Sequence, residues 1–178
     1  MSTAYYLRVS SSSQDTKSQE ADLKGHASTS PDAGWYRDKF TGKASLRISP
    51  PQRFSPRIAG WNFTIAEKPG PGEYRYLRFA WKSPTGTGIM LELADNGAWP
   101  KENETRGRLV SGKNTTKWQA VQVSDQVPRE WVVVTRDLWK EFGPMKLTGI
   151  APTALGGGAY FDRIELLQTL EDIAPPKK

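Results

Sequence analysis

The sequence predicts a mainly β protein, an antiparallel, jelly-roll-like β-sandwich preceded by a short β-α-β fragment. Three observations predict this class. The 178 residues include 16 Gly and 13 Pro, which end strands and form turns. Aromatic residues, which favour strands, make up 11% of the chain. From residue 44 onward, short runs of alternating apolar and polar residues recur between Gly, Pro and Asn.

The first 43 residues have a different pattern from the rest. Residues 4–9 and 35–40 are short apolar runs typical of strands. Between them, Thr16 and Gln19 have the spacing of a capping box, which satisfies free N–H groups at a helix start. We therefore expect a helix over about residues 16–27 and a β-α-β opening.

Residues 44–172 are expected to form the sandwich, and residues 173–178 a disordered tail. A short helix is predicted at residues 137–142, and a long polar loop at residues 101–113. Eight strands are expected, at residues 44–49, 60–66, 74–82, 88–94, 117–123, 130–136, 146–150 and 160–168.

Period-2 alternation assigns the faces of these strands. Leu77, Phe79 and Trp81 fall on one side and are predicted to be core. In the last strand, Ile164 is assigned to the core and Phe161 to the opposite face.

The residues opposite the core predict a mixed aromatic and polar face that could stack on sugar rings and bond their hydroxyls. Alternatively, these aromatics lie beneath the 101–113 loop or another domain. Trp99, in a predicted loop, is either a ligand contact or a hydrophobic plug. The candidate ligand residues are Tyr74, Tyr76, Arg78, Glu92, Trp99 and Trp118.

Composition excludes several classes of site. With no Cys and one His, the chain cannot form a disulfide framework, a thiolate zinc site or a two-His metalloprotease motif. We expect no cofactor. Ca²⁺ stays open because it needs only oxygen ligands, and Asp95, Asn96 and Asp162 are the residues considered for it.

Charge and hydropathy bear on partners and location. The net charge is +6, but residues 1–43 carry only +1 of it, so no basic stripe for DNA is evident. A mean hydropathy of −0.62, with no long apolar run, argues against a membrane partner. The N-terminus lacks a signal-peptide pattern, so we expect a cytoplasmic protein.

The most specific motif is the string YLRVSSSSQ at residues 6–14, continued by Gln19 and by residues 35–42. It resembles the active-site signature of the serine site-specific recombinases, the resolvase/invertase family. This resemblance implies that Ser10 is the nucleophile that attacks a DNA phosphodiester. It also implies that Arg8 holds the scissile phosphate, whose transition state needs fixed cations.

The chain departs from that family after residue 43. The later arginine segment, the long dimerisation helix and the DNA-binding part are missing from the sequence. We therefore expect a truncated leader whose Ser10 and Arg8 are vestigial, and DNA as a partner only if the leader functions. Deleting residues 1–43 is expected to leave the thermal midpoint almost unchanged.

Residues 44–170 resemble the carbohydrate-binding-module-like jelly rolls of large bacterial extracellular proteins. Three stretches carry this resemblance, residues 74–82, 129–138 and 158–166. It implies a non-catalytic binding or scaffolding module, joined by gene fusion to the leader, with a polysaccharide or another protein domain as partner. Two alternatives remain: a recombinase-family protein for DNA strand exchange, probed by Ser10→Ala, and a structural interaction domain with no small ligand.

Overall fold

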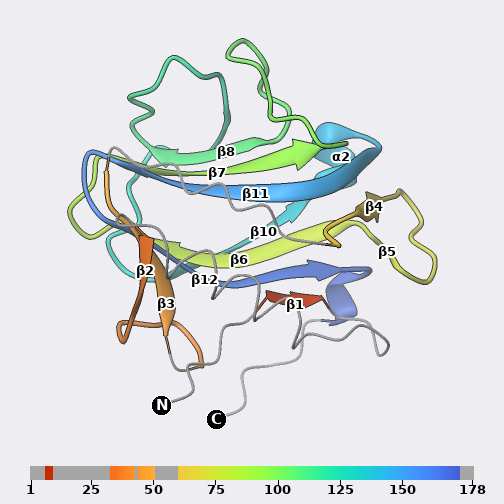
Figure 1. The fold of residues 1–178 in the computed structure, drawn as a ribbon, viewed down its shortest axis with the longest axis horizontal. Helices are drawn as coiled ribbons and strands as arrows, with labels where there is room; N and C mark the ends of the chain where they lie inside the picture. The colour runs from red at the N-terminus through yellow and green to blue at the C-terminus, as the bar shows by residue number, and fades with distance from the viewer. Residues whose placement is uncertain (1–6, 10–32, 43, 51–59, 173–178) are drawn as a thin grey trace.

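The computed structural model describes residues 7–9, 33–42, 44–50 and 60–172. Within them, two six-stranded sheets pack face to face with the core between them (Figure 1). The predicted β-sandwich is therefore confirmed. Among the helices of this described part, none is both long enough and apolar enough to cross a membrane.

The first sheet, sheet A, has the strand order β10-β6-β12-β3-β2, and β1 pairs in parallel with β12. Strand β12 pairs with β3 through residues 159–161, and with β1 further along, through residues 164–166. The strands of sheet A are β1 (Leu7–Val9), β2 (Ala33–Tyr36), β3 (Ser45–Ile48), β6 (Tyr76–Lys82), β10 (Val132–Asp137) and β12 (Ala159–Leu167).

The second sheet, sheet B, has the order β5-β4-β11-β7-β8-β9. The helix α2 (Leu138–Phe142) follows β10, and its N-cap residue Asp137 accepts a hydrogen bond from the Lys140 N–H. A short 3-10 helix, η1 (Leu170–Asp172), follows β12. The strands of sheet B are β4 (Phe63–Ile65), β5 (Glu73–Tyr74), β7 (Gly88–Asp95), β8 (Arg108–Gly112), β9 (Val121–Ser124) and β11 (Met145–Leu155).

The core has the composition that alternation predicts. Leu77, Phe79 and Trp81 of β6 are buried, and the ring centroids of Phe79 and Trp81 lie 4.8 Å apart in an edge-to-face contact. Ile89 and Leu91 of β7 face them from sheet B in the same cluster. Burying each of these side chains contributes about 1.5–3 kcal/mol.

Two predictions from the sequence were wrong. Residues 101–113 are not one loop, because residues 108–112 form β8, whose residues are all buried. Phe161 lies in the core rather than on the opposite face. A β-bulge between Asp162 and Glu165, with Arg163 at φ 49°, shifts the alternation and places Phe161, Ile164 and Leu166 together inside.

The end of the predicted leader pairs with the sandwich. Strand β2 pairs antiparallel with β3, and β1 pairs with β12. The predicted helix at about residues 16–27 and the tail at residues 173–178 lie outside the described residues. The boundary at residue 43 stays a prediction, but strands from both sides of it share sheet A.

Candidate functional site

The predicted ligand face does not form as one surface, because its members lie on different sheets and two of them, Tyr74 and Glu92, are buried. Tyr74 is fully buried in the core, where its ring packs edge-to-face on Phe63 at 5.6 Å. Tyr76 and Arg78 lie on the outer face of sheet A, whereas Glu92 lies on the outer face of sheet B. Alternation therefore grouped residues that the sandwich separates.

The outer face of sheet B is covered by two loops, residues 96–107 and 113–120 (Figure 1). Arg108 and Glu92 are directly opposite on β8 and β7, both are buried, and they form an ion pair at 3.0 Å. The Arg108 guanidinium also donates to the carbonyls of Pro100 and Lys101 in one loop, and to that of Gln119 in the other. Glu92 therefore lies beneath these loops and is not exposed to a ligand.

The two loop tryptophans have packing roles on this face. The Arg108 guanidinium lies 5.2 Å from the Trp118 ring centroid, and Trp118 packs against Met90 and Val110. The Trp99 ring lies over Gly149, where an added Cβ would come within 3.3 Å of it. Both rings remain half-buried and border shallow pockets.

Tyr76 and Arg78 lie at one end of the outer face of sheet A. Arg75 approaches the Tyr76 ring at 5.4 Å and forms an ion pair with Asp137 at 2.7 Å. Burial, with Arg163 nearby, lowers the pKa of Arg78. Its Nε and Nη1 atoms are buried and have no hydrogen-bond partner among the described residues. Among the described residues, this end presents the Tyr76 ring among charged groups rather than an aromatic platform.

The other end of that face gathers four aromatic rings, which we call the ring cluster: Tyr36, Phe40, Trp131 and Tyr160. The Tyr160 ring is central, with centroid distances of 6.1 Å to Tyr36 and 6.5 Å to Trp131. Phe40 extends the cluster at 6.2 Å from Trp131. Tyr36 and Phe40 are 40% and 36% exposed, and the other two rings are half-buried.

Strand register brings two cations into the ring cluster. Tyr160 is directly opposite Arg47 on β3 and Lys82 on β6. The Arg47 guanidinium lies 4.8 Å from the Tyr36 ring centroid, and Lys82 Nζ lies 5.1 Å from the Trp131 ring centroid. Asp38 pairs with Lys82 at 2.5 Å, so one carboxylate neutralises the more buried cation.

Asp162 fixes the segment that carries Phe40. Its carboxylate accepts hydrogen bonds from the backbone N–H groups of Phe40 and Thr41, both at 2.8 Å, and of Arg163 at 2.7 Å. Burial raises the pKa of Asp162, and the three N–H donors oppose that shift. Residues 37–42 are thereby attached to sheet A beside the rings.

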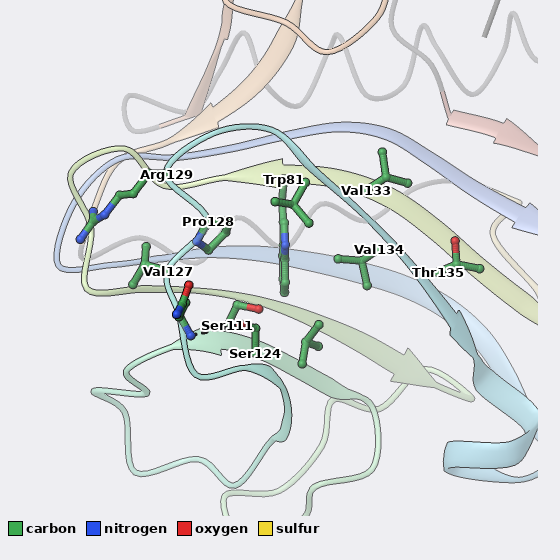
Figure 2. Close-up of a pocket in the computed structure, with 12 residues that line it drawn as sticks. Trp81, Ser111, Ser124, Val127, Pro128, Arg129, Val133, Val134 and Thr135 are labelled. Carbon is green, nitrogen blue, oxygen red and sulfur yellow. Dashed lines mark hydrogen bonds between the residues drawn. The ribbon is translucent and has the colours of Figure 1, made fainter. Parts of the chain in front are cut away.

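A groove lies between the edge strands β9 and β10. This groove of about 600 Å³ is lined by Val123, Val132 and Val134, with Trp81 in its middle. Figure 2 shows Val127, Pro128 and Arg129 at one end and Thr135 at the other. Trp81 is only 1% exposed, so the groove offers no free ring face.

The remaining predicted site residues are not assembled into a site. Ser10 lies outside the described residues, and Arg8 is placed only through the pairing of β1, opposite Glu165. Among the described residues, no group of three or more His, Asp or Glu side chains could hold a metal ion. Asp95 binds Arg106 and the Lys146 N–H, and Asp162 binds backbone amides.

The sequence pattern does not indicate the ring cluster. Its rings come from β2, the 37–42 segment, the residue before β10, and β12, which lie far apart along the chain. The only local signal was alternation in β10, which places Trp131 and Val133 on the same side of that strand. The bulge at Arg163 reverses the alternation in β12, so that Phe161 lies in the core and Tyr160 faces outward.

No family model matches the chain, and no curated protein matches it. Among solved structures it is similar to the Endo-D glycoside hydrolase domain of Streptococcus pneumoniae R6, with 14% identity, TM-score 0.50 and coverage of 80% of this chain but only 21% of that chain. It is also similar to a Family 30 carbohydrate-binding module, with 15% identity, TM-score 0.47 and coverage of 83% and 80%.

A third similar structure is CBM27-1 of Caldicellulosiruptor saccharolyticus, described in complex with mannohexaose. The identity is 14%, the TM-score 0.38, and the coverage 75% of this chain and 81% of that chain. The first likeness is one of fold alone, and the TM-scores of the other two are too low to say more. No comparison supports the resemblance of residues 1–43 to serine recombinases.

Proposed function

We propose that this chain is a non-catalytic binding module that holds a polysaccharide against the ring cluster. The supporting observation is the gathering of the four rings of the ring cluster, half-buried or exposed, with Arg47, Lys82 and Asp38 at one end of sheet A. Aromatic faces stack on the C–H face of a sugar ring, and a few placed polar groups bind its hydroxyls. The sequence resemblance to carbohydrate-binding-module-like jelly rolls agrees with this proposal.

A non-catalytic role is favoured by the contacts that Asp38 and Asp162 make beside the rings. Asp38 is paired with Lys82, and it also accepts a long hydrogen bond from Trp131 Nε1 at 3.4 Å. Both oxygens of Asp162 accept backbone N–H groups. Neither carboxylate is left to act as the acid or base that glycoside hydrolysis requires.

The test is affinity electrophoresis of the full chain in gels that contain mannan, xylan, mixed-linkage β-glucan or polygalacturonate. We expect retention by at least one polymer, and Trp131→Ala and Tyr160→Ala should each weaken it about tenfold or more, because central aromatic anchors dominate such interfaces.

Three control variants locate the site. Tyr76→Ala tests the far end of the same face, Trp118→Ala tests the covered face of sheet B, and Val132→Arg tests the groove of Figure 2. Each should bind within about twofold of the unmodified chain. The proposal is wrong if no polymer retains the chain, or if Trp131→Ala and Tyr160→Ala bind as well as these controls.

A further inference from the structure

The ring cluster contains a cation without a carboxylate partner in the described part of the chain. Arg47 lies 4.8 Å from the Tyr36 ring centroid and 6.0 Å from that of Tyr160. Its Nη1 donates to the Tyr36 hydroxyl at 2.8 Å, which orients the guanidinium but does not neutralise it. In contrast, Lys82 in the same cluster is paired with Asp38.

The Arg47 guanidinium has N–H groups that no described residue accepts from. Within the described part of the chain, the buried Nε has no hydrogen-bond partner and Nη2 donates to no group. A guanidinium is a planar fork whose remaining N–H groups match the oxygens of a carboxylate or sulfate. A half-buried cation beside aromatic rings also interacts with an anion more strongly than a fully solvated one does.

The turn before β12 leaves space for this arrangement. A Cβ added at Gly158 would lie 3.3 Å from Arg47 Nε and 3.5 Å from Nη2. An added side chain at Gly158 would therefore touch the guanidinium, which would have to shift by a few tenths of an ångström. Glycine at this position lets Arg47 keep its place beside the tyrosine rings.

The surrounding charge favours an acidic ligand. Arg37 and Lys39 are exposed in the segment that carries Phe40, so this segment presents cations beside the rings. The chain as a whole has a net charge of +6 and a pI near 9.5. A positive field raises the local concentration of an anionic polymer and its rate of association.

We infer that the ring cluster recognises an acidic polysaccharide, whose carboxylate or sulfate group binds Arg47 while its sugar ring contacts the aromatic side chains. This inference rests on the proposed sugar-binding function and adds the chemical class of the ligand. The specificity-determining residue is Arg47, with Gly158 as a positioning residue.

The experiment compares binding of polygalacturonate, its fully methyl-esterified form and dextran sulfate by isothermal titration calorimetry at low salt. The ester keeps the sugar backbone and removes the charge. We expect the unmodified chain to bind an acidic polymer at least tenfold more tightly than the ester. Dextran sulfate distinguishes sulfate from carboxylate as the group recognised.

Variants test the role of Arg47. Arg47→Gln should remove the preference for the acidic polymer, and Arg47→Lys should keep only part of it, because an ammonium lacks the fork. Gly158→Ala should weaken the preference for the acidic polymer severalfold. Lys117→Gln removes an exposed charge near the covered face of sheet B and should leave the preference unchanged. Circular dichroism confirms that each variant is folded.

Two outcomes separate the inference from the proposed function. Equal binding of acid and ester by the unmodified chain, or an undiminished preference in both Arg47 variants, overturns the inference and leaves sugar binding intact. Failure of every acidic and neutral polymer to bind overturns the proposed function, and the inference with it.

Discussion

The two outer faces of this sandwich are used in opposite ways. On sheet B, the outward side chains of β7 and β8 are buried under two loops that Arg108 fastens to the sheet. On sheet A, the outward-facing rings of the ring cluster, at the end where β2 and β3 lie, remain half-buried or exposed beside Arg47 and Lys82. An outward-facing side chain is therefore a ligand contact only where no loop covers it, which alternation along a strand does not reveal.

The cover of sheet B depends on a buried charge rather than on apolar packing alone. Besides its bonds to Pro100, Lys101 and Gln119, the Arg108 guanidinium donates to the Glu104 carbonyl, and the Gln119 N–H joins the two loops by donating to the Glu102 carbonyl. A buried guanidinium that satisfies several carbonyls is costly to remove, because each carbonyl loses its partner.

The largest effect is expected for Arg108→Met, which removes the buried guanidinium that faces Glu92. Breaking a buried ion pair by removing one partner costs about 3–5 kcal/mol. Urea unfolding should show a loss of that size in the free energy of unfolding. The double variant Glu92→Leu with Arg108→Met should lose less, because no buried carboxylate remains. A loss below about 1 kcal/mol for Arg108→Met would mean that the loops are held by other contacts.

Deleting residues 1–43 tests whether sheet A is complete without the leader. The deletion removes β1, β2 and two of the three backbone donors to buried Asp162. We expect the free energy of unfolding to fall by about 2–3 kcal/mol, because a buried charge that loses hydrogen bonds is costly. Binding at the ring cluster should also be lost, since Tyr36 and Phe40 are removed. A change under about 0.5 kcal/mol would instead favour the boundary at residue 43.

Much of the sandwich was predictable from the sequence. Eight expected strands match β3, β4, β6, β7, β9, β10, β11 and β12 in place if not in length, and the helix at residues 137–142 matches α2. Strand β8 was missed because it begins at Arg108, a charged residue whose burial depends on Glu92 and the loop carbonyls. The residues adjacent to Arg108 in the sequence do not indicate that Glu92 will pair with it.

The candidate site was largely unpredictable for a related reason. Tyr160 meets Arg47 and Lys82 through strand register, and register between strands distant in sequence is set by the whole core. The bulge at Arg163 then exchanges which residues face outward. Tyr74 was assigned to the ligand face, but β5 pairs with β4 on sheet B and points its ring into the core.

The smallest expected effect concerns how pH acts on Asp162, which attaches the 37–42 segment to sheet A. Burial raises its pKa above the ordinary Asp value of 3.8, although backbone N–H groups of Thr41, Phe40 and Arg163 act in the opposite direction. A carboxyl group with a higher pKa in the folded chain binds its proton more tightly when folded. Its contribution to stability is therefore fully present below the unfolded pKa and is lost as pH rises through the folded pKa.

Asp162→Asn removes this titration while keeping a side chain of similar size. We expect the difference in unfolding free energy, unmodified chain minus Asp162→Asn, to decrease as pH rises from below 3.8 through the raised pKa, and then to level off. Urea unfolding at a series of acidic pH values measures this difference. If the difference grows with pH instead, the N–H donors outweigh burial, and the 37–42 segment is held by a carboxylate that favours its charged form. Binding at the ring cluster would then weaken on acidification, which gives a second readout of the same balance.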